Sequence, residues 1–179
     1  MNTNFIKKFK IDKDNITLKT IQWEYIYAFA NFLEHFTSKH EDFYRIKKLL
    51  QNSKYTKNII KIIESQNDGE SLIICALNKY NEFIGFVILI KNTKKECEID
   101  IYIHKNYRNK GIGKILLQTI IEYTRYLNID IINLKVRKNN RKAIHLYQNI
   151  GFIQINQIKN SIIFNKKTTD EILMSLKIL

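Results

Sequence analysis

A change of periodicity near the middle of this chain constrains its fold more than any other feature. Ile99, Ile101 and Ile103 alternate with polar or aromatic neighbours, which is the period-two pattern of a strand with two unlike faces. Two glycines, Gly111 and Gly113, follow within a short basic loop. From residue 114 to residue 127 the apolar residues then recur at helical spacing. The stretch therefore predicts a strand, a glycine-containing loop and an amphipathic helix in direct succession.

The junction between that loop and that helix has the chemistry of an anion site. The first N–H groups of a helix have no partner within the helix, and the helix dipole is positive there. Glycine at positions 111 and 113 lets the backbone approach a bulky anion, because no Cβ stands in the way. Arg108, Lys110 and Lys114 add positive charge. A phosphate or pyrophosphate is therefore the expected ligand.

The remaining pattern predicts a single mixed α/β domain over residues 1–179, with a charged lead-in at 1–15. Strands are expected at 16–20, 71–77, 83–90, 98–103, 129–136, 152–158 and 171–178. Helices are expected at 23–36, 43–50, 57–64, 114–127 and 141–150. The three central strands should form an antiparallel meander, since turn signals of hairpin length separate them. The strands on either side of the helix at 114–127 should be parallel, because a helix connects them.

The charge and composition limit the class of partner. The formal net charge of +13 would suit a nucleic acid or an anionic cofactor. The basic residues are scattered in pairs, however, and the abundance of Lys, Asn and Ile with 0 Pro is typical of a genome rich in A and T. No nucleic-acid partner is therefore expected.

Cysteines, histidines and apolar runs limit the remaining classes. Cys75 and Cys97 each lie in a predicted strand and are expected to be reduced and buried. Neither has metal-ligand spacing with the 4 His, so no metal is expected. The charged start does not resemble a secretory signal, and the longest apolar run is too short to span a membrane. We expect a cytoplasmic protein without membrane contact.

A second motif lies in the predicted helix at 141–150 and its flanks, and it comprises Asn140, Ala143, Leu146, Tyr147, Gly151 and Phe152. These residues resemble the second half of the GNAT N-acetyltransferase fold. Arg108, Gly111 and Gly113 resemble the acetyl-coenzyme A pyrophosphate loop of the same family. The order of elements also matches. The resemblance is good from residue 71 to the C-terminus and poor over the first 70 residues.

The resemblance implies acetyl-coenzyme A (acetyl-CoA) as co-substrate and assigns roles to particular residues. The backbone of Ile101 and Ile103 would pair with the pantetheine arm. The loop that would hold the pyrophosphate comprises Arg108, Asn109, Lys110, Gly111, Ile112, Gly113 and Lys114. Asn140, Ala143 and Tyr147 would complete the cofactor site, with the Tyr147 hydroxyl facing the thioester sulfur. The alternative for Tyr147 is a core aromatic.

The proton acceptor for the reaction is less well defined by the sequence. Glu98 and Asp100 share one face of the central strand and are the catalytic candidates, with Glu98 ranked first by its match to the family. His104 is a third candidate by its titration range, although the end of the strand makes it a loop residue. In the ribosomal-protein branch of the family a Glu occupies the position of Lys135, and this departure argues against that substrate class.

The expected acceptor is the primary amine of a small molecule: a polyamine, an aminoglycoside or an amino sugar. Trp23, Glu24 and Tyr27 on the first predicted helix could wall its pocket by cation–π and ionic contacts. The alternatives are a protein or peptide N-acetyltransferase, a non-catalytic acetyl-CoA sensor and a basic nucleic-acid-binding domain. A homodimer paired through the final strand is possible, because strand edges seek partners.

Overall fold

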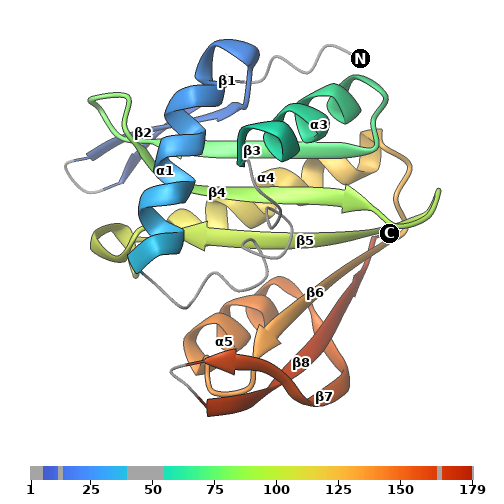
Figure 1. Ribbon diagram of the computed structural model, residues 1–179. Helices are drawn as coiled ribbons and strands as arrows, with labels where there is room; N and C mark the ends of the chain where they lie inside the picture. Colours follow the sequence, from blue (N-terminus) through green and yellow to red (C-terminus); the bar gives the residue numbers. More distant parts are fainter. Residues whose placement is uncertain (1–5, 12–13, 40–54, 165–166, 179) are drawn as a thin grey trace.

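The computed structural model describes residues 6–11, 14–39, 55–164 and 167–178 (Figure 1). The strands are β1 (Ile6–Ile11), β2 (Asp14–Thr20), β3 (Ser71–Leu77), β4 (Phe83–Lys91), β5 (Glu96–Ile103), β6 (Ile131–Arg137), β7 (Ile153–Phe164) and β8 (Lys167–Lys177). The helices are α1 (Ile26–Lys39), α3 (Tyr55–Asn67), α4 (Ile112–Tyr126) and α5 (Arg141–Ile150), with 3-10 turns η1 (Trp23–Tyr25) and η3 (Lys105–Tyr107). The helix expected at 43–50 lies outside the described residues.

All these strands form one 8-stranded sheet in the order β1-β2-β3-β4-β5-β6-β8-β7. The β5–β6 pair is parallel, and the other neighbouring pairs are antiparallel. The predicted crossover through α4 and the predicted antiparallel meander are therefore confirmed. So is the fold class, a single α/β domain with a mixed sheet flanked by helices.

Helices cover both faces of the sheet, as Figure 1 shows for α1 and α3 in front and α4 behind. The apolar strands explain this layering, because successive side chains point to opposite faces. On β3, Ile73 and Cys75 pack with α1 and α3, whereas Leu72 and Ile74 pack with α4. A strand that is buried on both faces reads as a continuous apolar run, which is what residues 71–77 are.

Both cysteines are buried and free, as the sequence predicted. Burial raises the pKa of the Cys97 thiol to about 12, and it raises that of Cys75 as well. Both thiols are therefore protonated at neutral pH and act as small apolar side chains. In the described part of the chain, no helix has the length and apolar character needed to cross a membrane.

The structure corrects three expectations about the two ends of the sheet. Residues 6–11, expected within a charged lead-in, form the edge strand β1 and pair with β2. Residues 159–170, expected between strands, belong largely to a long β7–β8 hairpin. The final strand β8 lies between β6 and β7, so both of its edges are already paired. It cannot be the strand that joins two subunits.

The β5–β6 pair separates soon after it begins. Its register contains three pairs and ends with Glu98 opposite Asn133, although β5 continues to Ile103 and β6 to Arg137. Figure 1 shows β6, β7, β8 and α5 turning away from the rest of the sheet at this point. The split opens a gap between the two strands, next to the start of α4.

Gly85 on β4 allows the close approach of β5, and its replacement should destabilise the fold. A Cβ at this position would lie 2.6 Å from the backbone oxygen of Tyr102, which cannot move without displacing the strand. We expect Gly85→Ala to lower the free energy of unfolding by about 1–3 kcal/mol, as overpacked cores do. Urea denaturation would measure this. Gly113→Ala is the comparison, because its Cβ would meet side-chain atoms alone, the nearest being on Leu146 at 3.3 Å. An equal loss in both variants would contradict the prediction.

Candidate active site

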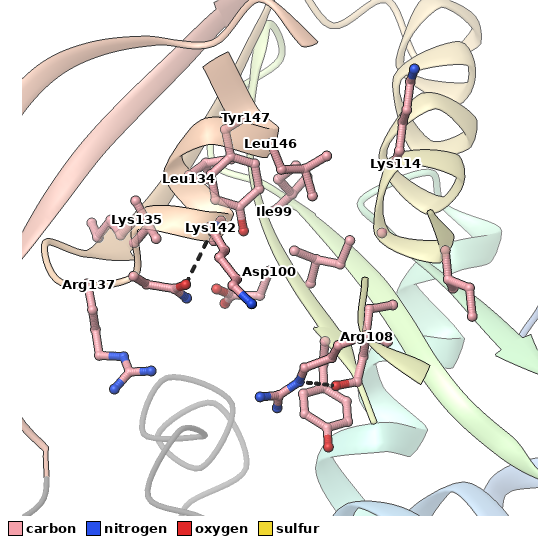
Figure 2. A pocket seen from close by; sticks show the side chains of 18 of the residues that line it. Ile99, Asp100, Arg108, Lys114, Leu134, Lys135, Arg137, Lys142, Leu146 and Tyr147 are labelled. Carbon is pink, nitrogen blue, oxygen red and sulfur yellow. Dashed lines mark hydrogen bonds between the residues drawn. The ribbon is translucent and has the colours of Figure 1, made fainter. Parts of the chain in front are cut away.

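A cavity of about 510 Å³ occupies the gap between β5 and β6. Its walls come from β5, the loop after it, the start of α4, β6 and α5 (Figure 2). The lining residues are Ile99, Asp100, Ile101, Tyr102, Ile103, Tyr107, Arg108, Asn109, Gly111, Ile112, Gly113, Lys114, Leu134, Lys135, Val136, Arg137, Asn140, Lys142, Ala143, Leu146, Tyr147, Ile162 and Glu171. Both sequence motifs therefore contribute to the same cavity.

The loop that leads into α4 is shaped by a left-handed residue. Gly111 is the N-cap of α4 and has φ 82°, a conformation that side chains other than glycine rarely adopt. No atom lies within 4 Å of the place where a Cβ would stand on it. The first N–H groups of α4 therefore have open space beside them, as an anion site requires.

The Arg108 side chain folds back against the end of β5. Its Nε donates a hydrogen bond of 2.9 Å to the carbonyl oxygen of Ile103. Its guanidinium carbon lies 5.8 Å from the centre of the Tyr102 ring. Figure 2 shows the guanidinium directed into the cavity from the β5 side. Because the Ile103 carbonyl already accepts from Arg108, Ile101 is the better placed of the two residues for backbone pairing with a ligand.

Helix α5 supplies the opposite wall. Asn140 is its N-cap, and the Asn140 side chain accepts a hydrogen bond from the Ala143 backbone N–H at 3.3 Å. Tyr147 lies one turn beyond Ala143 and is 7% exposed, with its ring centre 5.9 Å from that of Phe152. Figure 2 shows its hydroxyl directed toward the middle of the cavity. The ring is thus packed in the core while the polar end reaches the cavity, so both interpretations of Tyr147 describe part of it.

The cavity brings together most of the candidate site residues, with three exceptions. Lys110 is absent from the lining, because its ammonium lies 3.1 Å from the Asp14 carboxylate on β2. Glu98 is also absent, whereas Asp100 is present. His104 does not line the cavity either, and its Nδ1 accepts from the Asn106 backbone N–H.

Glu98 has a basic neighbour on the adjacent strand. Its Oε1 lies 3.6 Å from the Nζ of Lys135, and both side chains are about three-quarters buried. The pair forms because Glu98 and Lys135 lie on the same face of β5 and β6, two residues apart in the register. The two opposite charges attract each other across the strands, and the Glu98 side chain does not line the cavity. Of the two candidate bases, Asp100 is therefore the one that lines the cavity.

The balance of charge in the cavity is positive. The cationic lining residues are Arg108, Lys114, Lys135, Arg137 and Lys142, and the carboxylates are Asp100 and Glu171. Figure 2 shows these cations on both sides of the cavity. Such a lining is suited to an anionic ligand of extended shape. Among the described residues, no group of three or more His, Cys, Asp or Glu side chains is arranged to hold a metal ion.

Some lining residues were not predicted from the sequence. Leu146 lies three residues after Ala143 and four after Lys142, so helical spacing from Ala143 could have indicated first Leu146 and then Lys142. Glu171 is an acidic residue in an otherwise apolar strand, and this contrast was the only available signal. Conversely, Trp23 and Tyr27, expected at the acceptor pocket, are 50% and 77% exposed and do not line this cavity.

Comparisons with known proteins agree with this geometry. The sequence model of the acetyltransferase (GNAT) family matches residues 24–152. Acetyltransferase PseH from Campylobacter jejuni is 40% identical over 73 residues, which are 40% of this chain and 45% of that protein. The [ribosomal protein bS18]-alanine N-acetyltransferase of Haemophilus influenzae is 32% identical over 94 residues, which are 52% of this chain and 64% of that one.

The fold also has close counterparts among solved structures. A GNAT-family acetyltransferase from Streptococcus pneumoniae superposes with a TM-score of 0.79 at 21% identity, covering 91% of this chain and 99% of that one. At this identity the likeness shows the fold alone. The matched segments span about half to two-thirds of the two curated relatives named above.

Proposed function

The chain belongs to the GNAT acetyltransferase family, and from this premise we propose that it transfers an acetyl group from acetyl-CoA to the primary amine of a small molecule. The proposed acceptor classes are a polyamine, an aminoglycoside and an amino sugar. One observation carries the proposal. The gap between β5 and β6 holds a cavity whose charged lining residues are mostly cationic. The N-terminus of α4 lies at one end of this cavity, and the Tyr147 hydroxyl points toward its middle.

The residues of the cavity fit acetyl-CoA. The open space beside Gly111 and the start of α4 suit the pyrophosphate, with Arg108 and Lys114 as cations in the lining. Lys110 would contribute its backbone, since its side chain contacts Asp14. The part of β5 that lies beyond its pairing with β6 offers backbone groups to an amide-bearing arm, chiefly at Ile101. Asn140 and Ala143, at the start of α5, complete this side of the cavity.

The proposed reaction uses the side chains at the middle of the cavity. Acetyl-CoA supplies the acetyl group as a thioester. Because a free alkylamine has a pKa of about 10.4, the acceptor must lose a proton before or during attack. Asp100 would accept this proton, directly or through water. The Tyr147 hydroxyl would donate its proton to the departing sulfur, since a phenol pKa of about 10 is close to that of a thiol. A backbone N–H on β5 would polarise the carbonyl.

Asp100→Asn should show whether Asp100 or Glu98 is the general base. We expect kcat to fall about a hundredfold, which is a typical contribution for a general base, with little change in the KM for acetyl-CoA. Steady-state kinetics with the best acceptor would measure this. Glu98→Gln is made in parallel, because the Glu98 carboxylate is paired with Lys135 at 3.6 Å. A larger loss of kcat in Glu98→Gln than in Asp100→Asn would assign the base to Glu98 instead.

A protein N-acetyltransferase is the alternative, and the Haemophilus relative that acts on ribosomal protein bS18 is the reason to test it. Lys135 argues against it. It stands where that branch has a glutamate, and its ammonium is engaged with Glu98. A peptide acceptor would need its N-terminal amine to lose a proton beside this ion pair.

The experiment that tests the proposal is the release of free thiol from acetyl-CoA across a panel of amines. Spermidine, kanamycin, glucosamine and an N-terminal peptide of bS18 would represent the four classes. We expect selective turnover of one small-molecule class. Turnover of the peptide alone would favour the alternative. Tight binding of acetyl-CoA without any turnover would contradict the proposed activity and favour a sensor.

A further inference from the structure

Glu171 on β8 is a buried carboxylate that the proposed reaction does not use. It is 4% exposed and is the only charged side chain among the buried residues that the structure describes. It nevertheless lines the cavity. Burying an ionised carboxylate is costly unless hydrogen bonds or a counter-charge compensate for it. A residue of this kind therefore calls for a partner.

The protein supplies part of that partnership. Ser161 Oγ donates to Oε2 of Glu171 at 2.5 Å. Within the described chain, no other side chain is hydrogen-bonded to Glu171 and no ion pair reaches it. An ionised carboxylate can accept about four hydrogen bonds, so Oε1 retains its full accepting capacity. Since Glu171 lines the cavity, a ligand in the cavity can supply the missing donor.

Glu171 lies on β8, which β6 separates from β5 and therefore from Asp100, the proposed proton acceptor. Its neighbours Ile172 and Met174 pack into the core, in the cluster that contains Tyr147. Glu171 therefore points to the opposite face, where Arg137 lies across from it in the β6–β8 register. Strand β6 separates β8 from the gap at Tyr147, and neighbouring strands lie about 4.8 Å apart. Glu171 can thus reach a part of the acceptor that is remote from the amine being acetylated.

We propose that Glu171 binds a second hydrogen-bond donor group of the acceptor, either a protonated amine or a hydroxyl, some distance from the amine that is acetylated. This inference rests on the proposed function and deepens it, because polyamines, aminoglycosides and amino sugars all carry a second amine or hydroxyl group. A carboxylate accepts from both kinds of donor, so the shared chemistry is an N–H or O–H group presented to Oε1. Arg137 lies across from Glu171 on the same face, and its positive charge would disfavour an ammonium donor relative to a hydroxyl donor.

A set of three linear amines with the same six-carbon chain tests the proposal. Hexylamine carries no second group, 6-aminohexan-1-ol carries a hydroxyl and 1,6-diaminohexane carries a second ammonium. Binding of each to the full-length protein in the presence of coenzyme A would be measured by calorimetry. We expect the wild type to bind one bifunctional probe at least tenfold more tightly than hexylamine. This readout does not depend on turnover, so it distinguishes failure of this inference from failure of the proposed activity.

Variants at position 171 identify the residue and the donor. We expect Glu171→Ala to weaken the preferred bifunctional probe at least tenfold and hexylamine less than twofold. Glu171→Gln keeps a carbonyl acceptor but loses the charge, so it should retain most affinity for a hydroxyl and little for an ammonium. Glu122→Gln is the control with the same change of charge, because Glu122 is on α4 but does not line the cavity and its side chain is 58% exposed. Thermal melts of each variant would verify folding.

Three results would overturn the proposal. One is a wild type that binds neither bifunctional probe more tightly than hexylamine. Another is a folded Glu171→Ala variant that keeps the full preference of the wild type. The third is a folded Glu171→Ala variant that binds all three probes equally more weakly, which would make Glu171 a structural residue whose role is to hold Ser161 and the β7–β8 hairpin.

Discussion

Tyr147→Phe is expected to lower kcat for acetyl transfer about a hundredfold and to leave the KM for acetyl-CoA within about twofold. A positioned proton donor typically contributes this much or more to the rate. The phenyl ring would still pack against Phe152, since only the hydroxyl is removed from a side chain that is 7% exposed. Stability should therefore change little. Steady-state kinetics and a thermal melt would measure the two quantities.

The control for this prediction is Tyr126→Phe. Tyr126 is on α4, is 74% exposed and does not line the cavity, so its loss of a hydroxyl should leave kcat unchanged. Unchanged turnover in Tyr147→Phe would show that the hydroxyl is not the acid. A fall in both kcat and thermal stability would instead indicate that the Tyr147 hydroxyl has a structural role.

Gly111→Val is expected to weaken acetyl-CoA binding by at least a hundredfold. Two effects combine at this position. A β-branched residue is strained at φ 82°, and its side chain would fill the open space beside the start of α4. The second effect blocks the approach of a phosphate to the helix N-terminus. Calorimetric titration with acetyl-CoA would measure the loss of affinity.

Gly69→Val separates the two effects. Gly69 also has a positive φ, 71°, and a Cβ there would lie in ordinary contact with Leu127, at 3.6 Å. It does not line the cavity, so this variant carries a similar backbone strain with no obstruction of the site. We expect Gly69→Val to lose stability and keep its affinity for acetyl-CoA. Normal affinity in Gly111→Val would contradict the phosphate-loop assignment.

The parts of the fold that the sequence predicted well are those that depend on local pattern. The alternation at residues 99–103, the glycine loop and the helix after it need only the periodicity of a strand and a helix. Asn140 and Gly151 likewise act as caps within their own helix, with Gly151 at φ 110°. Local rules decide such features, so the sequence alone sufficed.

Features that depend on a distant partner were missed. Residues 6–11 carry three lysines beside three apolar residues, and they form a strand by pairing with β2. Lysine on an edge strand commonly prevents pairing with a strand of another chain. The charge that suggested an unstructured segment at residues 1–15 is therefore equally typical of an edge strand. The length of the β7–β8 hairpin was underestimated in the same way, since hydrogen bonds to the Asp170 side chain hold its polar middle, where the register shifts.

The candidate site shows the same division. Tyr147, Asp100 and the glycine loop were predicted, and all of them line one cavity. The contact of Lys110 with Asp14 spans 96 positions in the sequence and removes a predicted cation from the lining. The Glu98–Lys135 pair depends on the β5–β6 register, which no local pattern specifies. These long-range contacts decide which charged groups face the ligand.

The short ladder between β5 and β6 also bears on how the protein would respond to its supply of acetyl-CoA. Three register pairs join two parts of the sheet that are each extensively paired on their own side. A ligand lying along the open edge of β5 would act as the missing strand and bind the folded state alone. By thermodynamic linkage, each tenfold rise in its free concentration above Kd would then add about 1.4 kcal/mol to stability. The free energy of unfolding would thus depend on the concentration of acetyl-CoA, and the protein would be more stable where acetyl-CoA is abundant than where it is scarce.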